Sequence, residues 1–175
     1  MLIKPRPRAF TLIELVMVMI ILGIIGVAVL APKQNLSGIR QTQAALKIRS
    51  DLRYAQGYAL STQKRTLVSF DLANQAYSVY GETSPGSGSW SATPIPDPLS
   101  KGSFTVNLNT ADFSGVSIAQ TNFNSAGNSL VFDNAGKPYG SSSSGGSISA
   151  LTGQGSVTLS GGGIVTVEPN TGKVQ

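Results

Sequence analysis

The sequence predicts an α+β protein. One long N-terminal helix, with a transmembrane half followed by an amphipathic half, packs on an antiparallel, sandwich-like β head. Two observations predict the helix: residues 10–31 are almost entirely apolar, and apolar residues then recur at steps of three and four between positions 45 and 59. A third predicts the head, because from residue 66 onward short segments of alternating polarity are separated by Gly-, Ser- and Pro-rich turns.

The N-terminus predicts a leader and a membrane segment. Residues 1–9 form the leader, in which basic residues alternate with prolines that prevent a helix. Residues 10–31 carry only Thr11 and Glu14 as polar side chains, and their number is close to the ~20 residues needed to cross a bilayer. The positive charges precede the run, which places the leader in the cytoplasm and the head across the membrane. An ordinary secretory signal, cleaved after the small residues of GVAVLA at 26–31, stays open as an alternative.

Residues 32–65 are expected to form an amphipathic helix that packs on the head. The apolar residues lie on one stripe, and the charged residues lie elsewhere, with Asp51 on a solvated face. The stripe consists of Ala45, Ile48, Leu52, Ala55 and Ala59.

Residues 66–175 are expected to form the β head. Segments 66–71 and 76–81 alternate in polarity around the short connection LANQ and predict a hairpin. A Pro-, Gly- and Ser-rich surface loop is expected at 82–101, and a flexible tract at 140–147. Further strands are expected at 103–108, 115–120, 129–133, 156–160 and 163–168.

Composition excludes several classes of function. The 175 residues carry a net charge of +5, and much of this charge lies in the leader, so the rest of the chain is only slightly basic. The chain has neither Cys nor His, which removes disulfides, most zinc sites and the usual general base. We therefore expect no cofactor, no metal ion and no catalytic residue, and a protein that is not an enzyme.

Glu14 is the exceptional residue of the apolar run. An acid within a membrane helix is costly, so it usually faces a partner. If the chain were cut between Ala9 and Phe10, a new cationic amino group would lie one helical turn before Glu14. The carboxylate could then pair with the amine of its own chain or with that of a neighbouring chain, where the pair would set the stagger of bundled helices.

The N-terminal sequence RAFTLIEL resembles the class III signal of type IV pilins and type II secretion pseudopilins, in which a basic leader and a small residue precede Phe and an apolar helix. The resemblance implies that a prepilin peptidase cuts between Ala9 and Phe10 and methylates the amine of Phe10. It implies that Glu14 is the assembly glutamate. Ala9 departs from the family, which usually has Gly before the cut.

The rest of the chain is similar to the GspH/FimT group of minor pseudopilins, on the passage 50–71 and on the segments LVFDNAGKP and VTVEPNTGKV. The resemblance implies a minor pilin or pseudopilin subunit that is assembled into a type IV pilus or a type II secretion pseudopilus, in a structural role near the filament tip. It implies three partners: the peptidase, other pilin or pseudopilin subunits, and an inner-membrane assembly platform. The subunit would first reside in the bacterial inner membrane and then in the filament.

The alternative function is a pilin-like binding module whose head captures DNA or a surface. Basic side chains that would meet DNA phosphates are Lys47, Arg49, Arg53, Lys64 and Arg65, although the same residues fit a solvated helix face. Aromatic residues that would form an adhesive patch are Trp90, Tyr77, Tyr80 and Tyr139. Tyr77 and Tyr80 have opposite strand parity, so one of them is expected at the surface.

Overall fold

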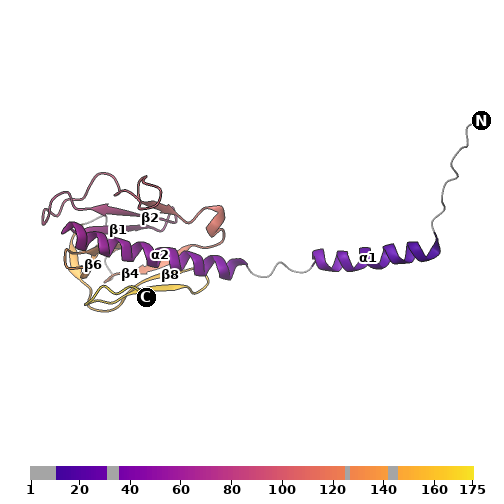
Figure 1. Ribbon diagram of the computed structural model, residues 1–175. Coiled ribbons are helices and arrows are strands. Elements are labelled where there is room, and N and C mark those ends of the chain that lie inside the picture. The colour runs from indigo at the N-terminus through magenta and orange to yellow at the C-terminus, as the bar shows by residue number, and fades with distance from the viewer. Residues whose placement is uncertain (1–10, 31–35, 125–126, 142–145) are drawn as a thin grey trace, which may run out of the picture. The chain divides into compact units, whose positions relative to one another are not determined.

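The computed structural model describes residues 11–30, 36–124, 127–141 and 146–175. The chain divides into two compact units, Met1–Asn35 and Leu36–Gln175. Helix α1, Leu12–Leu30, belongs to the first unit. The second unit contains helix α2, a short 3-10 turn at Ala111–Phe113 and two antiparallel sheets, which confirms the predicted α+β class (Figure 1).

Helix α2, Leu36–Thr62, packs on the head through the predicted apolar stripe. The buried stripe begins at Ala44, which is fully buried, whereas Ala45 is only partly covered. Ala45 packs against the core as predicted, and the stripe also includes Ala44, which the sequence did not identify. The helix ends where Gln63 adopts a left-handed backbone with a φ of 57°.

Nine strands form the two sheets of the described head. The larger sheet has the order β3-β2-β1-β5-β6-β7, and the smaller has the order β4-β8-β9. The predicted hairpin is present as β1, Thr66–Asp71, paired with β2, Ala76–Gly81. The other strands are β3 Thr105–Asn107, β4 Ile118–Asn122, β5 Ser129–Phe132, β6 Pro138–Ser141, β7 Ile148–Ala150, β8 Gly155–Leu159 and β9 Ile164–Val167.

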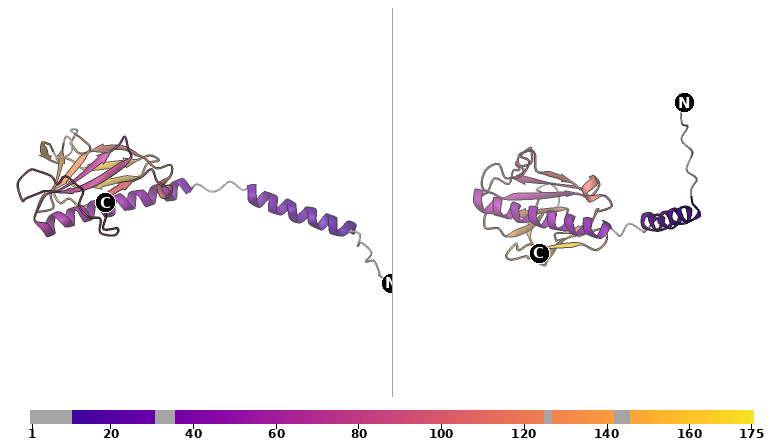
Figure 2. Two further views of the ribbon diagram at one scale, coloured as in Figure 1. Left: turned by 90° about the horizontal axis from the view of Figure 1, so that it is seen from above. Right: turned by 45° about the vertical axis from the view of Figure 1, so that its right-hand side comes forward.

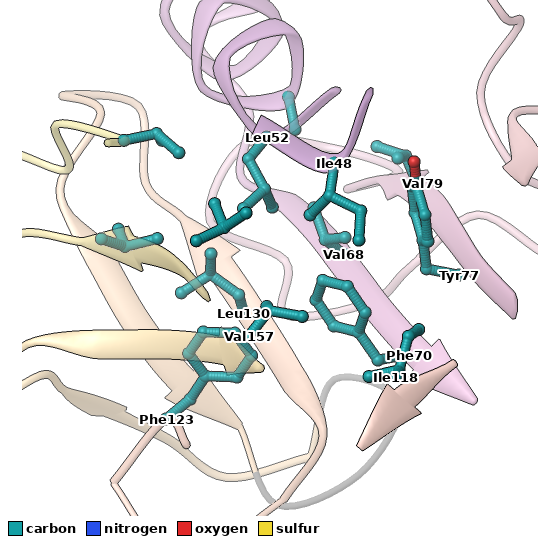
Figure 3. Packing of buried hydrophobic residues seen from close by; sticks show 14 of the residues in the cluster. Ile48, Leu52, Val68, Phe70, Tyr77, Val79, Ile118, Phe123, Leu130 and Val157 are labelled. Carbon is teal, nitrogen blue, oxygen red and sulfur yellow. The ribbon is translucent and has the colours of Figure 1, made fainter. Parts of the chain in front are cut away.

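One hydrophobic core joins α2 to both sheets. Ile48 and Leu52 of α2 meet Val68 of the larger sheet and Val157 of the smaller sheet within the same cluster (Figure 3). Figure 2 shows α2 lying along one side of the strands. Because a strand alternates its side chains between two faces, the inward residues of β1 leave Leu67 and Ser69 on the face turned away from α2.

The sequence did not predict β6 and β7. Gly140 and Ser141, expected in a flexible tract at 140–147, are buried in β6, so the prediction is wrong at these two positions. Residues 142–145 of that tract lie outside the described residues. Strands β6 and β7 carry much Ser and Gly, and their pairing comes from neighbouring strands rather than from a local apolar pattern.

Two turns with the pattern Asn-x-Gly-Lys, at 134–137 and 170–173, meet at α2. The Gln56 side chain donates to the carbonyl oxygens of Gly136 at 2.9 Å and Thr171 at 3.0 Å. At Gly172, which has a positive φ of 65°, a Cβ atom would lie 2.4 Å from the carbonyl oxygen of Gly136. Close approach therefore requires glycine there, and Gln56 fastens both turns to the helix.

Candidate functional site

The start of α1 has the geometry of a capped helix. Thr11 precedes the helix, and its carbonyl oxygen accepts the backbone N–H groups of Glu14 at 3.1 Å and Leu15 at 3.2 Å. The Thr11 hydroxyl also accepts the Glu14 N–H, at 3.4 Å. The spacing Thr-x-x-Glu is that of a capping box, which places Glu14 in the first turn. The predicted cleavage residues, Ala9 and Phe10, lie outside the described residues.

The apolar side chains of α1 from Leu12 to Ile25 are exposed. Leu12 is 83% exposed, Met19 67% and Ile25 52%. Glu14 is the single charged residue of this helix sequence and is exposed as well. Among the described residues, no helix combines the length and the hydropathy that crossing a membrane requires.

Asp51 of α2 is buried, which corrects the prediction that it lies on a solvated face. Its carboxylate accepts two hydrogen bonds from Lys47 Nζ, at 2.7 and 2.8 Å, and one from the hydroxyl of Tyr77 on β2, at 2.6 Å. Burial raises the pKa of Asp51, while the hydrogen bonds from Lys47 and Tyr77 act in the opposite direction. Burial and the nearby Asp51 carboxylate raise the pKa of Tyr77 well above its ordinary value.

The five basic residues proposed for DNA do not form one free cationic surface. Lys47 is paired with Asp51, and its ammonium also lies 5.6 Å from the centre of the Phe104 ring. Arg49 follows Lys47 by two residues, about 200° around the helix, so the two side chains leave it on nearly opposite sides. Arg53 lies nearer to Arg49 and donates to the carbonyl oxygen of Val174 at 2.9 Å.

The remaining two basic residues are held by the loop that follows β2. Lys64 donates to the carbonyl oxygen of Thr83 at 3.1 Å. The guanidinium of Arg65 binds the Glu82 carboxylate through Nε at 3.0 Å and through Nη2. These contacts engage the cations within the head, which does not favour the DNA-capturing alternative.

Glu82 is a structural residue that the sequence did not identify. Its side chain is buried and accepts backbone N–H groups from Arg65 at 3.2 Å, Gly86 at 3.2 Å and Gly88 at 2.7 Å. Burial raises its pKa, but the hydrogen bonds from Arg65 and from the loop N–H groups outweigh this effect and lower the pKa to about 2. Glu82 therefore fixes the start of the 82–101 loop. Its acceptor role depends on loop geometry, which gives no local sequence signal.

The aromatic residues divide as strand parity predicted. Tyr77 is 1% exposed and faces the core, whereas Tyr80 is half-buried on the opposite face. Trp90, also half-buried, lines a hollow of about 210 Å³ together with Leu67, Tyr80 and Ser91. Tyr139 lies on β6, outside this hollow, so the four aromatic residues do not form one patch.

The described part of the chain contains no group of three or more His, Cys, Asp or Glu side chains arranged to hold a metal ion.

Two family models match the chain. The prokaryotic N-terminal methylation motif matches residues 4–30, and the type II transport protein GspH matches residues 44–169. A search of curated proteins finds no match.

Two kinds of solved structure are similar to this chain. The minor pseudopilin EpsH from the type II secretion system of Vibrio cholerae has 13% sequence identity and a TM-score of 0.52, over 78% of this chain and 94% of that one. The type IV minor pilin FimU of Pseudomonas aeruginosa has 16% identity and a TM-score of 0.49, over 77% of this chain and 85% of that one. The likeness to EpsH shows that the two proteins share a fold.

Proposed function

This chain belongs to the type II transport protein GspH family, and we propose that it enters its filament by the route that its methylation motif implies. It is a minor pseudopilin- or pilin-like subunit of a type II secretion system or a type IV pilus. The family implies a membrane-anchored structural subunit that is processed by prepilin peptidase and contacts other subunits.

In this proposal, the peptidase cuts between Ala9 and Phe10 on the cytoplasmic side and methylates the new amine of Phe10. Residues 10–31 hold the subunit in the inner membrane as a single pass, with the head on the far side. The inner-membrane assembly platform then moves the subunit into the filament. The position of the positive charges before the apolar run supports this orientation.

The observation that carries the proposal is the exposed carboxylate at the start of an apolar helix. Glu14 lies in the first turn of α1, three residues after Thr11, and the large apolar side chains from Leu15 to Ile25 are exposed. Such a helix is stable only in lipid or packed against other apolar helices. The Glu14 carboxylate is then placed to pair with the Phe10 amine of a neighbouring subunit and to set the axial stagger.

The first test is the mass of the N-terminal peptide of the mature protein. A peptide that begins at monomethylated Phe10 is the expected result. A peptide that begins at Pro32 would indicate ordinary signal cleavage and would overturn the proposal.

The second test is the substitution Glu14→Ala, compared with Glu14→Gln and with Asp112→Ala, which removes an exposed acid of the head. Both Glu14 variants should insert into the membrane but be depleted from sheared filaments, because neither can pair with an amine. Asp112→Ala should be incorporated normally. Normal incorporation of Glu14→Gln would contradict the charge pairing.

A further inference from the structure

The face of the larger sheet that points away from α2 carries two ordered rows of side chains. Residues that oppose each other in register share a face, so the pairing assigns both rows. The hydroxyl row crosses five strands and consists of Thr105, Ser78, Ser69, Ser129 and Ser141. The aromatic row runs beside it and consists of Tyr80, Leu67, Val131 and Tyr139.

The 82–101 loop completes a hollow at one end of the aromatic row. Trp90 and Ser91 come from this loop, and with Leu67 and Tyr80 they line a space of about 210 Å³. None of the four side chains is charged at neutral pH. Two aromatic rings therefore bound a neutral hollow with hydroxyl groups beside it, and neither ring is fully buried.

The loop is held in place before any ligand arrives. Glu82 binds the loop N–H groups of Gly86 and Gly88, and it forms an antiparallel bridge with Trp90. The N–H of Ser91 donates to the carbonyl oxygen of Gly81 at 2.9 Å. A fixed aromatic wall avoids much of the entropy that ordering a loop on binding would cost.

The accessible part of the hydroxyl row lies next to this hollow. Ser78 and Ser69 are two residues from Tyr80 and Leu67 on the same strands, about 7 Å away along each strand. Both are partly exposed, and Thr105 beyond them is exposed. Ser78 and Thr105 hydrogen-bond each other at 2.9 Å, and each hydroxyl keeps further bonding capacity.

We propose that the hollow binds one ring of a neutral glycan, with the adjoining sugar residues lying along Ser78, Ser69 and Thr105. The apolar C–H face of a pyranose ring packs on aromatic rings, and its hydroxyl edge needs donors and acceptors beside them. A nucleic acid or an acidic polymer would require cations, which the lining lacks. A proline-rich peptide would use the aromatic rings, but its proline carbonyls only accept hydrogen bonds, whereas the hydroxyls of a glycan both donate to and accept from the row.

The sole tryptophan of the chain, Trp90, is a direct reporter of binding. The full-length mature protein, in a detergent without a sugar headgroup, would be titrated with cellohexaose, chitohexaose and maltohexaose while tryptophan fluorescence is followed. At least one glycan should give a saturable change with a Kd of about 1 mM or tighter. No saturable change with all three up to about 10 mM would overturn the proposal, as would a response to decaproline alone.

Variants locate the site. Tyr80→Ala should weaken binding about tenfold or more, whereas Tyr139→Ala removes the same side chain from the same row outside the hollow and should change the Kd less than about twofold. Equal effects of the two variants would contradict the assigned hollow.

Ser78→Val, which removes the hydroxyl and introduces a β-branched side chain suited to a strand, should weaken hexaose binding and leave disaccharide binding unchanged. An unchanged hexaose Kd in this variant would overturn the role of the hydroxyl row.

Glycan binding by the head does not depend on filament entry. Glu14→Ala is expected to bind the same glycan with the same Kd, so loss of assembly and loss of glycan binding are separable results. Thermal unfolding of each variant would show whether the head remains folded, and Trp90→Phe, followed by calorimetry, should keep most of the affinity because a ring remains in the wall.

Discussion

Helices α1 and α2 are both regular, yet they place their apolar side chains in opposite environments. In α1 the large apolar residues from Leu12 to Ile25 are 41% to 83% exposed, whereas the stripe of α2 from Ala44 to Ala59 is at most 1% exposed. The stripe of α2 is narrow and built largely from alanine, which lets the helix approach both sheets closely. The head therefore covers the apolar stripe of α2, whereas the described apolar side chains of α1 remain exposed and, in the proposed route, would be covered by lipid or by other helices.

The acids of the two helices differ in the same way. Asp51 of α2 is buried, and its carboxylate accepts hydrogen bonds from Lys47 and Tyr77 of the same chain. Glu14 of α1 is exposed at the first turn. An acid on α2 thus serves the packing of the head, whereas the acid on α1 is available to another molecule.

The largest expected effect separates the two helices directly. Leu52→Ala removes a fully buried side chain and should lower the free energy of unfolding of the head by about 2–5 kcal/mol. Ile20→Ala removes a side chain that is 57% exposed in the other compact unit. This substitution should change the free energy of unfolding of the head by less than about 0.5 kcal/mol. Urea unfolding followed by the fluorescence of Trp90 measures both. Similar losses in the two variants would refute the contrast.

Local patterns predicted some parts of the head well. Strands β1 and β2 have the expected bounds, because alternating polarity and a turn of Asn and Gln residues define a hairpin within a short stretch of chain. The stripe was predicted without Ala44, because Ala44 and Ala45 are chemically identical and only the packed sheets bury the first more deeply than the second.

Long-range contacts could not be predicted. The burial of Asp51 depends on Tyr77, which is 26 residues away on another element. The role of Glu82 depends on N–H groups that converge only when the loop is folded. The hollow beside Trp90 likewise combines two strands and a loop, so no sequence motif marks it.

The buried acid of α2 depends on a hydroxyl donated from β2. Tyr77→Phe removes the hydroxyl that donates to Asp51 at 2.6 Å and should lower the free energy of unfolding by about 1.5–3 kcal/mol, since a buried charge loses one donor. Tyr80→Phe is the matched control, because that hydroxyl lies on the opposite face of the sheet. Chemical denaturation compares the two variants. A control that loses as much as Tyr77→Phe would show that the Asp51 network is not the cause.

The smallest effect is expected for the acid dependence of Glu82, which holds a loop rather than the core. Its pKa in the folded head, about 2, lies below the ordinary value of 4.5, so its contribution to stability is complete above pH 4.5 and is lost as the pH falls towards 2. Asp51 has the opposite sign: its pKa is raised, so its contribution is largest below pH 3.8 and declines as the pH rises through the folded-state pKa. For Glu82, the loss of its charge means that the difference in unfolding free energy between the native protein and Glu82→Gln should shrink between pH 4.5 and 2. A difference of the same size at pH 6 and pH 2 would mean that Glu82 acts through its shape alone and that its charge does not hold the loop.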